Sequence, residues 1–204
     1  MTHDHAPASD IAFTRAVKEQ QRLHGSRGAY AQMERSGGWE TGVTDELAAF
    51  VARQTSFFLA TASADGQPYI QHRGGPRGFL RVLDEHTLAF ADFRGNRQYI
   101  SVGNLTENPR VHLFLIDYER RRRVKIWGTA RIDDDPALLA RLREPGDRTP
   151  VERAIVIQIA AWDANCPNHI PQRFEADDVR RALEARDQKI AELMSASTRV
   201  SDRV

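Results

Sequence analysis

Residues 56–93 read SFFLATASADGQPYIQHRGGPRGFLRVLDEHTLAFADF, and this stretch decides the fold class. It holds four short runs rich in β-branched and aromatic residues, at 56–63, 68–74, 78–84 and 87–93. Turn signals such as ADGQP and LDEH separate them, which is typical of strands joined by tight turns. The stretch therefore predicts consecutive β-strands.

Three further runs of the same kind follow, at 111–118, 124–132 and 154–162. A single interposed helix is too few for βαβ units, which need a helix after nearly every strand. We therefore predict a mainly β fold with flanking helices (α+β), built on an antiparallel barrel. Because the side chains of so small a barrel fill it, a sizeable ligand must bind in a surface groove or between subunits.

Helices are expected on both sides of this β region. Apolar residues recur at three- and four-residue intervals over Ser9–Leu23, and Thr44 or Asp45 can cap a short helix over 45–54. The predicted organisation is therefore a helical extension at 1–43, a barrel domain at 44–174 and a C-terminal helix at 175–204.

The C-terminal helix carries apolar residues near heptad spacing at Val179, Leu183, Ile190 and Leu193, with Arg186 interrupting the stripe. This pattern is typical of a helix that docks on its own domain. It also fits a short coiled coil. Both interpretations remain open from the sequence.

Composition excludes several classes of protein. A formal net charge of +1 argues against a protein held mainly by nucleic-acid backbone, and no apolar run reaches the roughly 20 residues of a membrane span. Cys166 is the only cysteine, so no internal disulfide or cysteine metal cluster can form. The start MTHDHAPASD lacks the apolar stretch of a secretory signal, so a cytoplasmic protein is expected.

The most informative segment is 87–109, in which a strand runs into the turn RGNRQ and then into a helix that Asn108-Pro109 ends. Asn96 is positioned to cap that helix. Arg94 and Arg97 bring positive charge to its free N–H groups, and together these features predict a phosphate site. The alternative is a solvated turn whose arginines only keep it soluble.

Two other segments are unusual. In HRGGPRGF, Arg73 leads into Gly74 and Gly75, a composition that lets a flat ligand approach the backbone. The alternative is that this segment is only a wide hairpin connection. Residues 162–174, WDANCPNHIPQRF, are too polar for a simple spacer and suggest the rim of a site. Cys166 and His169 lie three residues apart in that segment, but no accompanying motif supports a metal site or a cysteine nucleophile.

Taken together, these segments resemble the pyridoxamine 5′-phosphate oxidase-like family of FMN-binding split β-barrel proteins over residues 44–174. The resemblance implies a homodimer that holds FMN in two equivalent clefts between subunits. No metal site is expected, because no motif accompanies Cys166 and His169. The C-terminal pattern that binds substrate phosphate in the true oxidases has no counterpart in residues 181–197, so pyridoxamine phosphate is not the expected substrate.

The resemblance also assigns residues to the cofactor. Along the flavin and its ribityl chain it places Arg73, Gly74, Gly75, Ala91, Asp92 and Phe93. At the phosphate it places Asn96, Arg97 and Gln98, where Gln98 replaces a lysine of the family and Arg94 supplies the missing charge. From the partner subunit come Lys125 and Trp127. Closing the cleft over the ring are Asn165, Pro167, Gln172 and His169, the last as a proton donor.

The expected function is that of an FMN-dependent oxidoreductase, which passes hydride or electrons between the flavin and a small-molecule substrate or electron donor. A cofactor carrier or sensor without turnover is the alternative, with FMN, haem or a deazaflavin as its ligand. His72, His169 and Cys166 are conceivable haem ligands. A dimeric interaction module, whose arginine turn contacts acidic partners, is a further alternative.

Overall fold

The computed structural model describes residues 6–143, 149–165 and 168–201. The chain divides into two compact units, Met1–Ile116 with Arg123–Cys166, and Asp117–Arg122 with Pro167–Val204. The first unit contains the β-sheet together with the N-terminal helices, and the second contains the C-terminal helix.

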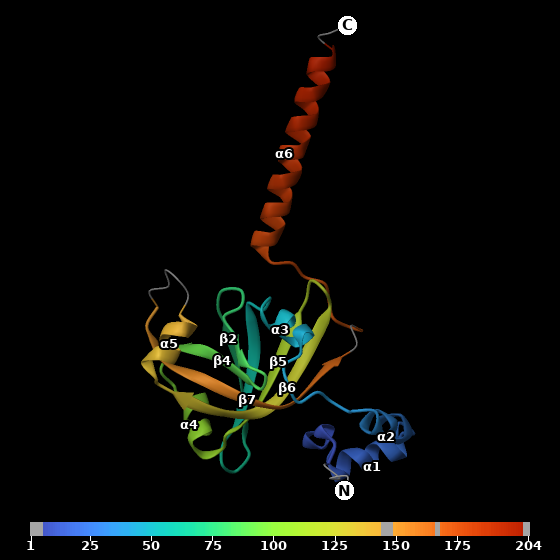
Figure 1. The fold of residues 1–204 in the computed structure, drawn as a ribbon, viewed down its shortest axis with the longest axis vertical. Coiled ribbons are helices and arrows are strands. Elements are labelled where there is room, and N and C mark those ends of the chain that lie inside the picture. Colours follow the sequence, from blue (N-terminus) through green and yellow to red (C-terminus); the bar gives the residue numbers. More distant parts are fainter. Residues whose placement is uncertain (1–5, 144–148, 166–167, 202–204) are drawn as a thin grey trace. The chain divides into compact units, whose positions relative to one another are not determined.

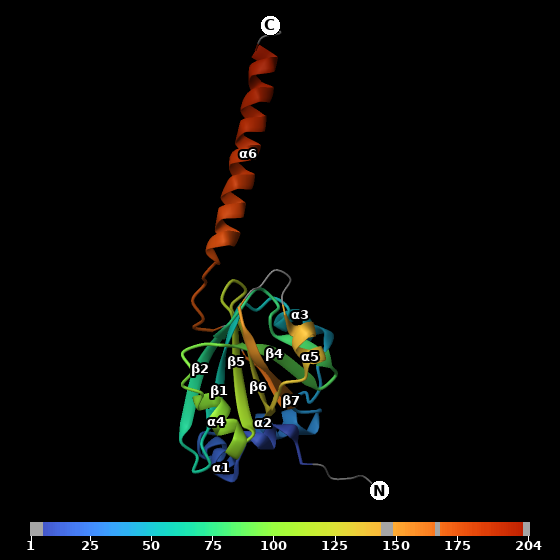
Figure 2. The ribbon, with the colours of Figure 1, turned by 90° about the vertical axis from the view of Figure 1, so that its left-hand side faces the viewer.

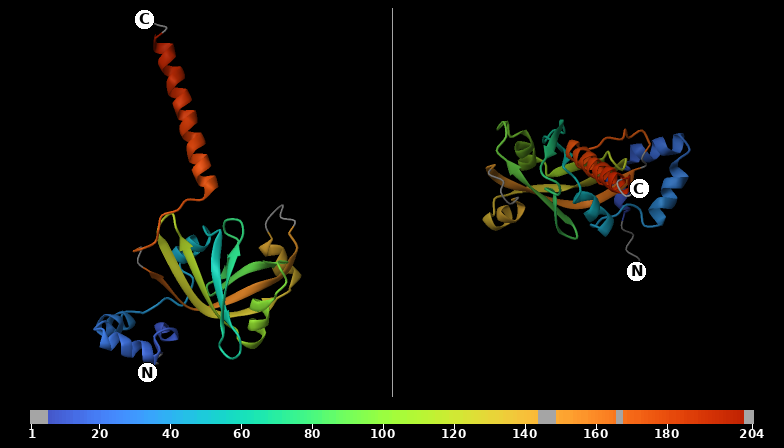
Figure 3. Two further views of the ribbon diagram at one scale, coloured as in Figure 1. Left: turned by 180° about the vertical axis from the view of Figure 1, so that it is seen from behind. Right: turned by 90° about the horizontal axis from the view of Figure 1, so that it is seen from above.

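Among the described residues, seven strands form one antiparallel sheet in the order β2-β1-β5-β6-β7-β4-β3. Figure 1 shows this sheet, with β2, β4, β5, β6 and β7 labelled. The bounds of the strands are β1 Ser56–Ala62, β2 Pro68–Gly74, β3 Arg81–Asp84, β4 Thr87–Phe93, β5 Arg110–Asp117, β6 Arg122–Asp133 and β7 Val151–Asn165. Each of the seven predicted runs overlaps one of these strands, although the run at 78–84 begins three residues before β3. This confirms the α+β class and the antiparallel sheet. The strands curve around a common core (Figure 3).

The core follows from the alternation of side chains along each strand. On β1, Phe57, Leu59 and Thr61 are buried and their neighbours are partly exposed. Since successive side chains of a strand point to opposite faces, this pattern gives the sheet one inner face. The largest fully buried side chains of the core include Phe57 and Phe90 from the sheet, together with Phe50 from the helix that precedes β1.

Strand β4 departs from this alternation, because both of its faces are covered. Leu88 and Phe90 belong to the main core, whereas Ala89 and Ala91 belong to a second cluster beside α5 (Pro136–Leu142). We did not predict α5 from the sequence. The sequence nevertheless carries a helix-start signal there, because Asp135 caps the helix and Pro136 occupies its first turn.

Two other helices flank the sheet. In α3 (Asp45–Val51), the Thr44 hydroxyl accepts a hydrogen bond from the Leu47 N–H at 3.2 Å, as the sequence predicts for an N-cap. The other helix, α4 (Ile100–Glu107), follows β4 and lies beside β1 and β2 (Figure 2). It ends at the predicted Asn108-Pro109.

The N-terminal extension contains more elements than the expected single helix over Ser9–Leu23. A 3₁₀ turn, η1 (Ala8–Ile11), precedes α1 (Arg15–Leu23), because the Thr14 side chain caps Val17 and starts a new helix. A further helix, α2 (Arg27–Arg35), was not predicted.

Aromatic contacts hold this extension against the sheet. The Trp39 ring stacks on Trp127 of β6, with centroids 4.6 Å apart, and Phe13 packs on Trp39 at 5.1 Å. The Trp162 indole N–H donates to the Gly42 carbonyl at 2.7 Å. Residues 6–43 are therefore attached to the barrel through β6 and β7.

The second unit contains α6 (Ala176–Ser201), which lies within the C-terminal helix predicted at 175–204. Its apolar residues Val179, Leu183, Ile190 and Leu193 are between 42% and 59% exposed. In the ranges that the structure describes, no helix is long and apolar enough to cross a bilayer.

Candidate functional site

A cavity of about 250 Å³ lies where the turn between β4 and α4 meets β2 and β7. Strands β2 and β4 are far apart in the order of the sheet, yet side chains from both line this cavity. The residues predicted to bind the cofactor that lie on its wall are Arg73, Asp92, Phe93, Asn96, Arg97 and Gln98. The structure therefore brings the centres of two predicted segments, HRGG and RGNRQ, to one place.

Strand β2 contributes one face to the cavity. Tyr69, Gln71 and Arg73 alternate along the strand and all line the cavity, whereas the intervening Ile70 and His72 are exposed. Tyr69 and Gln71 were missed in the sequence, although the period of two that starts from Arg73 points to them. The Ser101 hydroxyl, at the start of α4, donates to the Gln71 side chain at 2.8 Å.

The turn before α4 differs from the prediction in one respect. Asn96 does not cap the helix, because its side chain accepts instead from the Gln98 N–H at 3.2 Å, in a local turn. The residue at the N-cap is Tyr99, which makes no side-chain capping bond. Arg97 and Tyr99 both have left-handed backbones, with φ of 62° and 54°, which few non-glycine residues adopt.

The first turn of α4 lies on the wall of the cavity. Ile100, Ser101 and Val102 line the cavity, and the N-cap residue of the helix, Tyr99, makes no side-chain capping bond within the described part of the chain. The first N–H groups of a helix carry partial positive charge, so this end favours an anion. Arg97 lies on the same wall of the cavity, beside this helix end.

Four arginines and two carboxylates set the charge around the cavity. Arg73 Nη1 lies 2.5 Å from Asp92 Oδ1, and Arg153 Nε lies 3.7 Å from the other Asp92 oxygen. Asp92 is buried, so it needs such partners. This carboxylate therefore orients Arg73 toward the cavity.

The second carboxylate is Glu152, which was missed in the sequence. Its oxygens lie 3.1 Å from Arg94 Nε and 2.7 Å from Arg153 Nη2, and the Tyr99 hydroxyl is 3.3 Å away. The hydrogen bond from Arg94 lowers the pKa of Glu152 below its ordinary value, with smaller contributions from Arg153 and Tyr99. The Tyr99 side chain raises the pKa of Arg97.

Glu152 reaches the cavity because β7 carries a bulge there. Asp92 pairs with Arg153 and the next residue, Phe93, pairs with Val151, so Glu152 has no partner on β4. A bulge re-aims the extra side chain, and strand periodicity alone cannot reveal it.

Other predicted cofactor residues lie outside this cavity. Ala91 belongs to the second core cluster, and Arg94 reaches the cavity only through Glu152. Gly74 ends β2, and the Gly75 N–H donates to the Thr55 carbonyl at 3.0 Å. A side chain at Gly75 would meet the Phe79 ring at 2.7 Å, so this glycine also serves core packing.

Lys125 and Trp127 lie together on β6, outside the cavity. Lys125 Nζ lies 5.4 Å from the Trp127 ring centre and 3.5 Å from Asp163 Oδ2. The His112 ring packs on Trp127 at 4.7 Å, and burial together with the charge of Lys125 lowers the pKa of His112. The predicted contribution of Lys125 and Trp127 to the cofactor cleft of a partner subunit stays a prediction.

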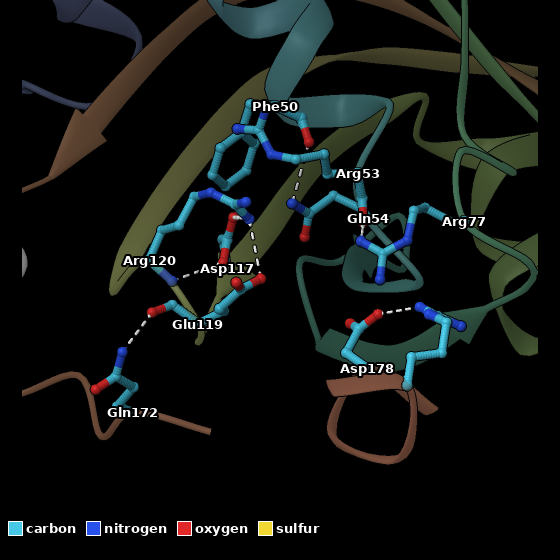
Figure 4. A network of polar contacts seen from close by, with 10 residues as sticks. Phe50, Arg53, Gln54, Arg77, Asp117, Glu119, Arg120, Gln172 and Asp178 are labelled. Atoms are coloured by element: carbon cyan, nitrogen blue, oxygen red, sulfur yellow. Dashed lines mark hydrogen bonds and ion pairs between the residues drawn. The ribbon is translucent and has the colours of Figure 1, made fainter. Parts of the chain in front are cut away.

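The remaining predicted residues belong to the end of β7 and the second unit. Asn165 ends β7, where its backbone pairs with Arg123, and Pro167 lies outside the described residues, as does Cys166. In the second unit, the Gln172 side chain donates to the Glu119 carbonyl at 2.9 Å (Figure 4). His169 is exposed and has a left-handed backbone, with φ of 65°.

The chain is similar in sequence to one known protein family. The sequence model of the pyridoxamine 5′-phosphate oxidase family matches residues 43–166, which is more than half of the chain. No curated protein matches the chain in sequence.

Several solved structures are similar in part. HupZ of Group A Streptococcus is 20% identical, with a TM-score of 0.49 over 65% of this chain and 99% of that one. An FMN-binding protein from Syntrophomonas wolfei is 15% identical, with a TM-score of 0.49 over 71% and 97%. A Clostridium acetobutylicum protein related to general stress protein 26 is 17% identical, with a TM-score of 0.47 over 66% and 94%.

Proposed function

This chain belongs to the pyridoxamine 5′-phosphate oxidase family, and we propose that it is an FMN-dependent oxidoreductase. The FMN phosphate binds in the cavity between β2, β7 and the start of α4. The observation that carries this proposal is the convergence of Arg73 and Arg97, from separate segments, on a helix end without a cap. The protein acts as a cytoplasmic homodimer with a cofactor cleft at each subunit boundary, and its substrate is a small redox-active molecule.

The residues present fit a phosphate with an attached polyol chain. Arg73 Nε is buried and has no hydrogen-bond partner among the described residues, so a donor is left for a ligand. Because unpaired buried donors are costly, an acceptor at this place is favourable. Gln71, Ser101 and Asp92 line the same cavity and offer hydrogen bonds to hydroxyl groups.

The chain's own residues have distinct tasks in this proposal. Arg97 and the first turn of α4 hold the phosphate, while Asp92 keeps Arg73 in place. FMN, when bound, supplies the transfer of hydride or single electrons. His169 donates a proton at its imidazole, and Lys125 with Trp127 complete the cleft of the neighbouring subunit.

Arg97→Ala tests the phosphate site. Removal of a charge-assisted contact costs roughly 1.5–3 kcal/mol, so FMN should bind roughly 10- to 100-fold more weakly to the variant. Titration of the apoprotein with FMN, followed by flavin fluorescence, measures this change. Arg131→Ala is the matched control, because Arg131 is an exposed arginine on β6 that pairs with Asp133 outside the cavity. Equal affinity of the Arg97 variant and the control would remove the phosphate site from the proposal.

An absorption spectrum of freshly purified protein separates the candidate cofactors. A flavin band supports the proposal, a Soret band indicates haem, and a colourless sample that takes up no FMN contradicts it. Anaerobic mixing with NADH, NADPH or a reduced deazaflavin then tests turnover. Bound flavin that none of these donors reduces would favour a cofactor carrier over an enzyme.

A further inference from the structure

Helix α6 presents an exposed apolar stripe, which no contact among the described residues of its own unit covers. It is 26 residues long, about 39 Å at 1.5 Å per residue. Val179, Leu183, Ile190 and Leu193 are all exposed along it. Most helices in proteins are stabilised by packing of their apolar face, so a stripe of this kind indicates a partner.

The spacing of the stripe identifies the kind of partner. Steps of four, three, four and three residues connect Val179, Leu183, Arg186, Ile190 and Leu193. This is the a/d repeat of a coiled coil, with Leu183 and Ile190 at a and the other three at d. Ile at a with Leu at d favours two parallel strands.

Arg186 is the one charged residue of the stripe, and its neighbour Asp187 makes it compatible with a second copy. In a parallel pair, a d side chain enters a hole formed by four residues of the facing helix, and one of these follows the equivalent d position. The hole that receives Arg186 therefore includes the Asp187 of the other copy. Within one helix, Arg186 Nη2 already lies 2.8 Å from Asp187 Oδ1, so each carboxylate can serve guanidinium groups from both helices.

Other ion pairs lie outside the stripe and leave it clear. Arg180 pairs with Asp177, and Lys189 pairs with Glu192, each within one helix. These pairs keep the outer surface of α6 polar and support the helix by itself. A second copy of the same helix is thus the occupant that the apolar stripe and its single charge both fit.

We propose that α6 forms a parallel two-stranded coiled coil with the α6 of a second copy of this chain, in register at Leu183, Ile190 and Leu193. The interaction goes beyond the proposed function, because it uses neither the cavity nor FMN. If the barrels also dimerise, the coil forms at the high effective concentration of a tethered pair, which compensates for its short length.

Cysteine cross-linking of the full chain tests the coil. In a Cys166→Ser background, Ile190→Cys places thiols at facing positions, whereas Gln188→Cys places them on the outer side of the helix. Cα atoms more than about 7 Å apart cannot be bridged, so mild oxidation should give roughly tenfold more disulfide-linked dimer with Ile190→Cys than with Gln188→Cys. Leu193→Cys serves the same purpose if the first variant folds poorly.

A charge reversal tests the register. Added to Ile190→Cys, Arg186→Glu sets like charges against Asp187 of the other copy and should reduce the yield of linked dimer several-fold. Arg186→Glu with Asp187→Arg restores opposite charges and should recover the yield. If α6 associated only through non-specific apolar contact, the double variant would not recover the yield of linked dimer.

Two outcomes would overturn the coil. Equal cross-linking of Ile190→Cys and Gln188→Cys would show that α6 has no paired face. Failure of both Ile190→Cys and Leu193→Cys to link, in folded protein, would exclude the parallel register. The flavin spectrum of the same samples reports separately on the cavity, so either proposal can fail while the other stands.

Discussion

At Gly128 the backbones of β6 and β7 approach so closely that no side chain fits. A Cβ atom there would lie 2.1 Å from the Gln158 carbonyl oxygen. The cause is a bulge, because Trp127 pairs with Ala161 while Gly128 pairs with Ile159. The extra residue of this bulge is Ala160 of β7, and the bulge lies beside Trp127, a residue predicted to face the cofactor of the other subunit.

Gly128→Ala should therefore destabilise the protein. Since the obstacle is backbone rather than a flexible side chain, the strands must separate, at a cost of roughly 1–3 kcal/mol or more. Gly103→Ala is the control, because nothing lies within 4 Å of a Cβ at this position in α4. There alanine should stabilise by roughly 0.5–1 kcal/mol. Chemical denaturation measures both, and similar free energies of unfolding for the two variants would contradict the close approach.

At the scale of single elements, α3 shows how a short helix depends on its end. It has seven residues, of which Leu47, Phe50 and Val51 are buried in the main core. So short a helix is not stable by itself, and its first turn relies on the Thr44 hydroxyl. The cap thus positions core side chains as well as satisfying an N–H group.

Thr44→Ala should lower the free energy of unfolding by roughly 0.5–2 kcal/mol, because the Leu47 N–H loses its partner. Thr44→Ser keeps the hydroxyl and should be close to the wild type. Thermal unfolding followed by circular dichroism measures the difference. If Thr44→Ser lost as much stability as Thr44→Ala, the threonine methyl group rather than the cap would be responsible.

At the scale of the first unit, an aromatic stack is one of the attachments of the N-terminal extension, beside the backbone contacts of Glu40 and Gly42 with Trp162. Trp39 lies between Phe13 and Trp127, and Lys125 Nζ lies 6.0 Å from its ring centre. Stacked aromatic pairs contribute roughly 0.5–1.5 kcal/mol beyond their buried area. The extension therefore opens more easily than the sheet does.

Trp39→Ala should release the extension while the barrel stays folded. Trypsin should cut at Arg15, Arg22 or Arg35 several-fold faster in this variant, while the fragment that starts near residue 40 resists. Leu23→Ala is the control, because Leu23 is 67% exposed and its truncation should leave the cleavage rate unchanged. Mass spectrometry of the early fragments identifies the cuts, and unchanged cleavage of the Trp39 variant would assign the attachment to other contacts.

The sequence alone determined the features that depend on neighbours along the chain. The strands follow from runs of β-branched and aromatic residues between turn signals, and Thr44 caps α3 as its position before Asp45 predicts. Arg73 and Arg97, which line one cavity, were predicted as site residues because the HRGG and RGNRQ segments are unusual in composition, and their role in binding stays a prediction. The resemblance to the family, carried by these segments, is confirmed by the match over 43–166.

Only the tertiary structure decided how those segments meet. Glu152 and Gly128 depend on bulges in the pairing of distant strands, and Asn96 forms a local turn instead of the expected cap. The physical reason is that hydrophobic period and capping act over a few residues, whereas register is set by contacts between residues far apart in the chain. The cavity is lined by residues of β2, β4, α4 and β7, so it depends on contacts between residues far apart in the chain.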